Sequence, residues 1–332
     1  GALVNLRGNP SNVLKLPALV FCEWAGLARR LLRRNYDVLH SHWILPQGFT
    51  GVLAARPLRI PHLLTVHGGD VFALRGRFLA GFKRFALRHA DAVTVNSAAT
   101  RNAVTAIAPR LAALYTLPMG VAETRPDPAV VAGLRSRHRR GKGPLLVFVG
   151  RLVYEKGVDD LIHAVAALAP RSPDVTAVIV GEGQDQARLE KMVRDLGVAD
   201  RIAFAGWVAP EQVPNYLAAA DAFVGPSKRA PDGWIEAQGL AFIEAMLAGT
   251  PVIATRLGGI PDAVKHEETG LLVSEGAPHE IAAAVERLVR EPRLAQHLAE
   301  AGHRLAQSKF TRGAAAGAFS ELLGKLLLRK GR

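Results

Sequence analysis

The sequence has 332 residues, of which 49% are hydrophobic and 21% charged, and this composition is typical of a soluble globular protein long enough for two domains. Its single cysteine, Cys22, excludes an internal disulfide bond, and no cysteine or histidine spacing indicates a zinc site. The longest uncharged apolar run near the start, residues 16–22, is too short to span a bilayer, and no signal-peptide pattern precedes it. We therefore expect a cytoplasmic protein.

The net charge of +13 is concentrated in the first part of the chain. Residues 1–122 hold 15 Lys and Arg against 4 Asp and Glu, a balance of +11, whereas residues 123–332 hold 27 against 25, a balance of +2. A basic first part fits nucleic acid, an anionic membrane surface or an acidic acceptor molecule. Nucleic acid is the weakest of these partners, because no nucleic-acid-binding motif is present. A generally arginine-rich proteome is an equally simple explanation.

The first part of the chain alternates between helical and strand patterns. Apolar, β-branched runs such as LLTV and AVTV are typical of strands that are buried on both faces. Strands that alternate with helices predict a parallel sheet with helices on its faces, so we expect an α/β domain. The predicted elements are helix 17–34, a strand within 36–43, helix 47–55, strand 62–66, helix 76–89, strand 92–95, helix 98–108 and strand 113–117.

A second alternating series follows residues 118–128, which hold three prolines without periodicity and are predicted to be a linker. The series predicts a second doubly wound domain, with a ligand at the carboxyl ends of its strands in a cleft between the domains. Its predicted elements are strand 145–149, helix 158–167, strand 176–180, helix 184–196, strand 202–205, helix 211–219, strand 222–224, helix 240–247, strands 252–254 and 271–273, helices beginning near 278 and 293, and a last helix 312–328.

Residues 232–255 carry the strongest indication of function. The amides of Gly239, Leu240 and Ala241 are predicted to open a helix, and a helix N-terminus beside a glycine binds anions. Two carboxylates, Glu236 and Glu244, flank this position. Carboxylates accept hydrogen bonds from vicinal diols, and a diphosphate between two diols describes a sugar nucleotide. Solvated helix charges are the simpler alternative for such a pair.

Other candidate residues follow the predicted strands. Arg151 and Lys156 come after strand 145–149, where a guanidinium and an ammonium group would neutralise a leaving diphosphate. A pair of exposed loop residues is the alternative. His67 and Asp70 come after strand 62–66 in a glycine-containing loop, although a lone histidine in this position is more often structural.

The order of these motifs resembles a known family. The two glutamates with seven residues between them are similar to the signature of retaining GT-B-fold glycosyltransferases of glycosyltransferase family 4 (glycosyltransferases group 1), and the resemblance covers nearly all of the chain. It implies two Rossmann-like, doubly wound parallel-sheet domains, 1–122 and 123–332, facing each other across a cleft. The motifs are GRLVYEKG (150–157), GEG (181–183), FAGWV (204–208), EAQGLAFIEA (236–245), GGIPD (258–262) and, more weakly, TVHGGD (65–70).

The resemblance implies a donor-binding role for residues of the second domain. Arg151 and Lys156 match the family's diphosphate clamp, and Gly150 allows the backbone to approach the phosphates. Glu244 matches the ribose ligand, and Glu236 matches the acid beside the donor sugar.

The resemblance also implies contacts for the base, the phosphates and the transferred sugar. His67 would contact the sugar, and Asp70 would contact the donor or only orient the loop. The alternative for Trp207 is that its side chain belongs to the hydrophobic core. The base-binding backbone is Gly206, Trp207 and Val208, and the amides at the helix start are Gly239, Leu240 and Ala241.

The function that the resemblance implies is hexose transfer from a nucleoside-diphosphate sugar to a polysaccharide or glycolipid acceptor in cell-envelope or exopolysaccharide synthesis. Retention would come from front-face attack, in which the leaving phosphate oxygen takes the acceptor proton. No cofactor or metal is expected, because no Asp-x-Asp motif is visible. A non-catalytic sugar-nucleotide-binding protein or an inactive fragment is the alternative.

The ends of the chain lead to two further expectations. In the family, the first domain opens with a strand, a glycine-rich turn and a helix, and no such unit precedes Gly1, so the first β-α units are expected to be missing. The last helix, 312–328, is expected to cross back to the first domain.

Helix 76–89 has two possible roles. Three phenylalanines share one of its faces and three arginines lie nearly opposite, a pattern that fits either a helix covering the sheet or peripheral contact with an anionic membrane at the cytoplasmic face. The residues are Phe78, Phe82 and Phe85, and Arg77, Arg84 and Arg88.

Overall fold

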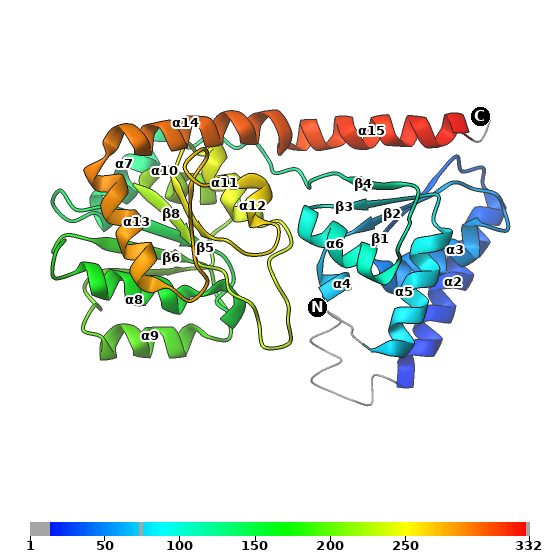
Figure 1. Cartoon of the computed structure of the whole chain (residues 1–332), viewed down its shortest axis with the longest axis horizontal. Coiled ribbons are helices and arrows are strands. Elements are labelled where there is room, and N and C mark those ends of the chain that lie inside the picture. Colours follow the sequence, from blue (N-terminus) through cyan, green and yellow to red (C-terminus); the bar gives the residue numbers. More distant parts are fainter. Residues whose placement is uncertain (1–13, 73–75, 330–332) are drawn as a thin grey trace. The chain divides into compact units, whose positions relative to one another are not determined.

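The computed structural model describes residues 14–72 and 76–329, which form two compact units (Figure 1). Of the described residues, unit 1 takes 14–72, 76–96, 100–117 and 318–329, and unit 2 takes 97–99 and 118–317. Each unit is built on a parallel sheet, so the expected α/β fold class is confirmed.

The sheet of unit 1 has four parallel strands in the order β1-β2-β3-β4. The central strands are apolar because both of their faces are covered, and every residue of β2 and β3 is buried. The strands are β1 (Leu39–His42), β2 (His62–Val66), β3 (Ala92–Val95) and β4 (Leu114–Thr116).

Helices connect the strands of unit 1, and the C-terminal helix packs on the same unit. Leu322 and Leu326 of α15 (Arg312–Arg329) are buried against Leu63 of β2 and Ala92 of β3. The remaining helices of this part are α2 (Leu16–Arg33), η2 (Ile44–Gly48), α3 (Phe49–Ala55), α4 (Gly69–Phe72), α5 (Arg77–His89) and α6 (Ala98–Ile107).

The aromatic face of α5 mostly faces inward. Phe82 and Phe85 make edge-to-face contacts with Phe49 of α3, with ring centroids 5.1 Å and 5.6 Å apart. Phe78 is exposed and touches only Phe82 among the described rings. Two of the three phenylalanines therefore favour a helix that covers the sheet.

The sheet of unit 2 has six parallel strands in the order β10-β9-β8-β5-β6-β7. The chain moves outward from β5 in one direction and then returns to β8 on its other side, which is the strand order of a doubly wound Rossmann-like sheet. The strands are β5 (Leu145–Val149), β6 (Thr176–Val180), β7 (Ile202–Gly206), β8 (Ala222–Gly225), β9 (Val252–Thr255) and β10 (Leu271–Val273).

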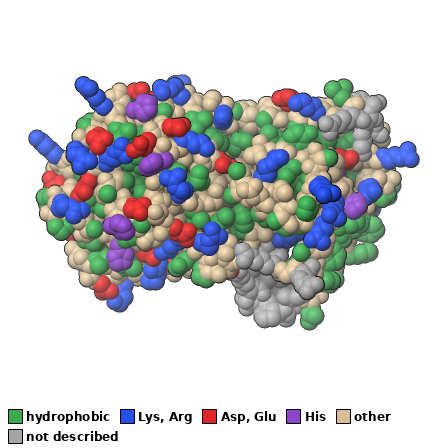
Figure 2. All heavy atoms as spheres, in the orientation of Figure 1, with side chains coloured by type: hydrophobic (Ala, Val, Ile, Leu, Met, Phe, Trp, Pro, Cys, Tyr) green, Lys and Arg blue, Asp and Glu red, His purple; other side chains and the backbone are tan. Residues whose placement is uncertain are grey.

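Helices cover both faces of the unit 2 sheet (Figure 1). One apolar cluster joins the sheet to α8 (Val158–Leu168), α9 (Gln186–Asp195) and α13 (Pro278–Arg290). A second cluster joins the other face to α10 (Val213–Ala219), α11 (Leu240–Leu247) and α14 (Pro292–Lys309). On the view of this unit in Figure 2, acidic and basic side chains are interspersed.

The sequence prediction lacks helix α7 (Pro128–His138), which has no buried residue, and three one-turn elements. Helix α7 begins where the linker was expected to end, and because it buries no residue it leaves no apolar periodicity to detect. Its start is nevertheless capped, because Asp127 Oδ1 accepts a hydrogen bond of 2.8 Å from Ala129 N. The one-turn elements η3 (Tyr154–Lys156), α4 and α12 (Ile260–Ala263) are too short for a periodic signal.

The packing of α15 on unit 1 is expected to contribute measurably to stability. Leu326→Ala removes a side chain that is only 4% exposed, and we expect unfolding free energy to fall by about 2–4 kcal/mol. Leu328→Ala on the same helix is the control, because Leu328 is 77% exposed, and it should change stability by less than about 0.5 kcal/mol. Denaturant unfolding measures both, and equal effects would contradict this packing.

Candidate functional site

The loops after the strands of unit 2 meet at one edge of its sheet. The sheet order reverses between β5 and β8, and such a switch point opens a crevice at the carboxyl ends of the strands. Backbone hydrogen bonds tie neighbouring loops together: Gly181 N donates to Gly206 O at 2.8 Å, and Leu152 N donates to Glu182 O at 2.9 Å. The GEG turn thus lies between the loops that follow β5 and β7.

Two glycines let the loops around Glu236 approach closely. Gly157 has a φ of 66°, and a Cβ atom there would lie 1.8 Å from the carbonyl oxygen of Pro226. Gly258 has a φ of 59°, and its Cβ atom would lie 2.0 Å from the carbonyl oxygen of Glu236. A side chain at either position would force the loops after β5, β8 and β9 apart.

Helix α11 starts at this edge, where the sequence predicts an anion site. Gly239 has a φ of 78°, and the helix runs from Leu240 to Leu247. The first amides of a helix have no intrahelical acceptor, and the helix dipole adds positive character at that end. The backbone of Gly239, Leu240 and Ala241 therefore offers unpaired donors to an anion.

Glu244 lies one turn into α11 and is half-buried. Burial raises the pKa of its carboxyl group. Within residues 14–72 and 76–329, no hydrogen bond or ion pair to this carboxylate is seen. A half-buried acceptor without a protein donor is suited to a ligand that brings hydroxyl groups.

Glu236 and Lys156 form an ion pair in the centre of this edge. Lys156 Nζ lies 2.5 Å from Glu236 Oε2, and the Glu236 residue is only 8% exposed. The ammonium group also lies 5.9 Å from the centre of the Trp234 ring. A charge buried to this degree needs its partner, so the two side chains are mutually dependent.

Arg151 differs from Lys156 because its side chain is largely exposed. It pairs with Glu155, with Nη2 to Oε1 at 3.9 Å, which is a weak contact between an exposed guanidinium and a half-buried carboxylate. Gly150 precedes it and donates from its backbone N to Val180 O at 3.0 Å. The guanidinium is therefore available to a ligand anion at the end of β5.

Trp207 is exposed, so its alternative place in the core is wrong. Its side chain sits on the turn after β7 and is 68% exposed. Its backbone N donates to Glu182 Oε1 at 3.2 Å, and Gly206 before it has a φ of 69°. Glu182 thus shapes the turn that contains Val208, a role that the sequence analysis missed although it noted the GEG motif.

In unit 1, His67 lies at the carboxyl end of β2 and is coupled to a second histidine. His67 Nε2 and His42 Nδ1 are 2.9 Å apart, and the two rings are stacked. Burial, followed by the charge of His42, lowers the pKa of His67 to about 4, so the ring is neutral at pH 7. His42 was missed, although its position at the end of the neighbouring strand β1 is visible in the sequence.

Asp70 holds the backbone around His67. Its carboxylate is fully buried and accepts hydrogen bonds from the amides of His67 at 3.1 Å, Gly68 at 3.0 Å and Ile44 at 2.9 Å. All of its visible partners are backbone amides of unit 1. This geometry favours the loop-orienting role for Asp70.

A cavity of about 900 Å³ opens beside these histidines. It lies between α2 and β1, and its wall includes His40, His42 and Trp43. Arg29, Arg30 and Arg33 of α2 line it as well, which makes this cavity basic.

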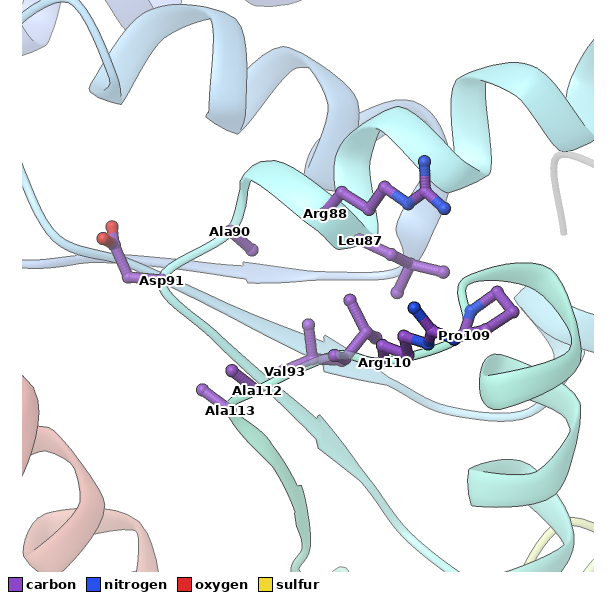
Figure 3. A pocket seen from close by; sticks show the side chains of 10 residues that line it. Leu87, Arg88, Ala90, Asp91, Val93, Pro109, Arg110, Ala112 and Ala113 are labelled. Atoms are coloured by element: carbon purple, nitrogen blue, oxygen red, sulfur yellow. The ribbon is translucent and has the colours of Figure 1, made fainter.

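A second cavity, of about 480 Å³, lies at the opposite ends of the strands (Figure 3). Its lining includes Ala90 and Asp91 before β3, and Ala112 and Ala113 before β4. Asp91 Oδ2 accepts a hydrogen bond of 2.8 Å from His62 N. Because this cavity lies at the amino ends of the strands, it is separate from His42 and His67 at the carboxyl ends of β1 and β2.

Two negative findings concern the part of the chain that the structure describes. No cluster there has three or more His, Cys, Asp or Glu side chains placed to hold a metal ion. No helix among the same residues is both long and apolar enough to cross a bilayer.

Two sequence models of known protein families match this chain. A sequence model described as "Glycosyl transferases group 1" matches residues 134–305, which is more than half of the chain and contains the whole Glu236–Glu244 edge. The chain belongs to this family. A second model, "Glycosyl transferase 4-like domain", matches residues 3–120 of this group 1 glycosyltransferase family member.

Two mycobacterial relatives share a name, GDP-mannose-dependent alpha-(1-6)-phosphatidylinositol monomannoside mannosyltransferase. The Mycolicibacterium smegmatis protein is 36% identical over 279 residues, which are 81% of this family member and 72% of that protein. The Mycobacterium tuberculosis protein is 38% identical over 234 residues, covering 68% of this chain but only 60% of the relative.

A solved structure supports the fold. The crystal structure of Anabaena Alr3699/HepE in complex with UDP aligns with a TM-score of 0.81 and 24% identity, over 91% of this chain and 82% of that one. The two Rossmann-like sheets of this family member are therefore those of the GT-B fold, as the resemblance implied.

The histidines of unit 1 are expected to make stability depend on pH. Burial lowers the pKa of His40, His62 and His67 from 6.5 to about 4 in the folded chain. Below pH 6.5 these histidines become protonated in the unfolded chain, whereas in the folded chain they stay neutral down to about pH 4. The free energy of unfolding should therefore fall as the pH decreases across this window. One pKa unit corresponds to about 1.4 kcal/mol, so the fully buried His62 contributes up to roughly 3 kcal/mol.

Melting temperatures between pH 7.5 and pH 4.5 measure this dependence. His62→Gln should flatten the decline, whereas His297→Gln on the exposed face of α14 should leave it unchanged. A wild-type melting temperature that is constant over this range would contradict the burial of these rings.

Proposed function

We propose that this chain is a retaining hexosyltransferase that uses a nucleoside-diphosphate sugar as its donor. The observation that carries the proposal is the arrangement at the carboxyl edge of unit 2. There a helix N-terminus lies between two buried or half-buried glutamates, and two basic residues follow the neighbouring strand. In this proposal, the diphosphate, the ribose and the sugar of the donor would each meet protein groups at this edge that are suited to bind them.

In this proposal, different residues of the edge bind different parts of the donor. Glu244 accepts hydrogen bonds from the ribose diol, and its missing protein partner supports this role. The amides of Gly239, Leu240 and Ala241 meet the diphosphate, with Arg151 beside them. The turn Gly206–Val208 holds the base, and the solved UDP complex of the structural neighbour is consistent with a nucleotide ligand.

The Lys156–Glu236 pair would exchange partners when the donor binds. In the structure each charge neutralises the other. A diphosphate offers Lys156 a stronger anion, and the released Glu236 carboxylate would then accept hydrogen bonds from the sugar hydroxyls. His67, held neutral in unit 1, is proposed to contact the same sugar.

The proposed reaction is front-face substitution. The bond between the anomeric carbon and the phosphate oxygen breaks, the acceptor oxygen bonds to the same face of that carbon, and the leaving phosphate oxygen takes the acceptor proton. Arg151, Lys156 and the start of α11 stabilise the negative charge of the leaving diphosphate. We propose that no divalent metal ion is required, since these cationic groups serve that role.

The acceptor is proposed to be a saccharide or a lipid-linked saccharide at the cytoplasmic face of an anionic membrane. Unit 1 is basic, and its 900 Å³ cavity combines three arginines with the histidines of β1. These cations suit an acceptor that carries phosphate. The names of the mycobacterial relatives include phosphatidylinositol monomannoside, a lipid-linked saccharide, which supports the same class.

The donor site is tested by nucleotide affinity. Isothermal titration with UDP, GDP and ADP should identify one preferred diphosphate, and Glu244→Gln and Arg151→Ala should each weaken it by roughly 10-fold to 100-fold, or about 1.4–2.7 kcal/mol. Arg304→Ala is the control, because Arg304 is an exposed residue of α14 paired only with Glu300 at 3.8 Å. Equal binding by all four proteins would contradict the proposed donor site.

Transfer is tested separately from binding. With the preferred donor and a lipid-linked saccharide acceptor, wild type should form acceptor-dependent product that keeps the anomeric configuration of the donor. Glu236→Gln should lower turnover by roughly 100-fold while changing nucleotide affinity less than about 5-fold, because the nucleotide itself does not need Glu236. Donor binding without product from any acceptor would favour the alternative, a non-catalytic sugar-nucleotide-binding protein.

A further inference from the structure

Gln238 lies within the proposed donor loop, yet its side chain is bonded to a distant segment. The residue is only 4% exposed. Its Nε2 donates to the backbone oxygen of Met119 at 2.9 Å, and its Oε1 accepts from the backbone N of the same residue at 2.9 Å. Both ends of one amide side chain are thus paired with both backbone groups of one residue.

Met119 belongs to the segment that joins the two units. Unit 1 ends its continuous run at Leu117, and the chain enters unit 2 at Pro118. Two residues after Met119, Val121 N donates to Phe310 O at 2.8 Å, and Arg312 N donates to Val121 O at 2.9 Å. The joining segment is therefore held on unit 2 by a backbone bridge at Val121 and by the Gln238 side chain at Met119.

An amide is the side chain that fits this place. It presents a donor and an acceptor side by side, and Met119 offers the complementary pair. An apolar side chain of equal length would take away the partner of both the amide and the carbonyl of half-buried Met119, and an ionised carboxylate would place oxygen against the Met119 carbonyl. Hydrogen bonding, and not only the filling of space, distinguishes glutamine here.

The contact between Gln238 and Met119 matters for the proposed donor site because of where Gln238 lies in the loop. Glu236 is two residues before it, and Gly239, which opens α11, directly follows it. Glu236 is itself held by Lys156 and, through its carbonyl oxygen, by the amide of Gly259 at 2.9 Å. If Met119 moved, the buried side chain of Gln238 would pass the movement on to the Glu236 carboxylate and to the start of α11.

We propose that Gln238 is a positioning residue, which fixes the Glu236–Gly239 loop against the joining segment at Met119 so that Glu236 is held in place for sugar transfer. The role in transfer rests on the proposed hexosyltransferase function. The clamp itself does not, because it is defined by two hydrogen bonds that can be measured without substrate.

The clamp is tested by hydrogen exchange resolved to single amides. In Gln238→Met, the Met119 amide should exchange roughly 10-fold faster or more, because its hydrogen bond to the Gln238 side chain is lost. The Val121 amide, bonded to Phe310, is the internal control and should keep its protection. Unchanged protection at Met119 would overturn the clamp.

The role in transfer is tested with Gln238→Glu, whose side chain has the same shape. A protonated carboxyl group offers one donor and one acceptor, as the amide does, whereas its ionised form offers only acceptors. The turnover of this variant relative to wild type should therefore rise roughly 10-fold or more as the pH is lowered through the pKa of the introduced carboxyl. Taking the ratio to wild type removes every pH effect that the two proteins share.

Two controls separate the possible outcomes. Gln307→Glu places the same charge on an exposed position of α14 and should show a flat ratio. Nucleotide affinity of the Gln238 variants should fall less than their turnover does, since Glu244 and Arg151, which also hold the nucleotide, are unchanged. A flat ratio for Gln238→Glu, or full turnover in Gln238→Met, would overturn the positioning role, whereas an inactive wild type would contradict the proposed function and leave the exchange result to decide the clamp.

Discussion

The buried ion pair between Lys156 and Glu236 is the contact on which the proposed site depends. Its 2.5 Å length requires that the loops after β5 and β8 touch, and Gly157 allows this by approaching the Pro226 carbonyl more closely than any side chain would permit. Each charge of the pair compensates the burial of the other. A sugar nucleotide would bind the two groups of the pair separately, with the Lys156 ammonium at the diphosphate and the Glu236 carboxylate at the sugar.

Around this pair, the site combines groups that are satisfied with groups that are not. Glu236 is paired with Lys156 through Oε2, and its backbone oxygen accepts a hydrogen bond from the amide of Gly259, so its loop is held in place. Glu244 and the first amides of α11 remain open toward a ligand. This division explains how one edge of a parallel sheet holds its backbone rigid and still offers charge and hydrogen bonds to a donor.

Most strands and long helices could be predicted from the sequence, because parallel strands buried on both faces and amphipathic helices leave periodic apolar patterns. Helix α7 was missed because it buries no side chain, and the inward packing of Phe82 and Phe85 depends on Phe49, which is distant in the sequence. Motif order placed the glutamates and basic residues at one sheet edge. It could not reveal the His42–His67 contact, the exposed Trp207 or the Gln238 clamp, since each depends on tertiary contacts.

A crystal structure with the nucleoside diphosphate that binds most tightly would test the central claim most directly. The account predicts ribose hydroxyls within hydrogen-bonding distance of Glu244, the diphosphate at the start of α11 beside Arg151, and a Lys156 ammonium group that has moved from Glu236 to a phosphate oxygen. A nucleotide bound elsewhere, for example in the cavity beside Arg88 and Arg110, with the Lys156–Glu236 pair intact, would contradict it.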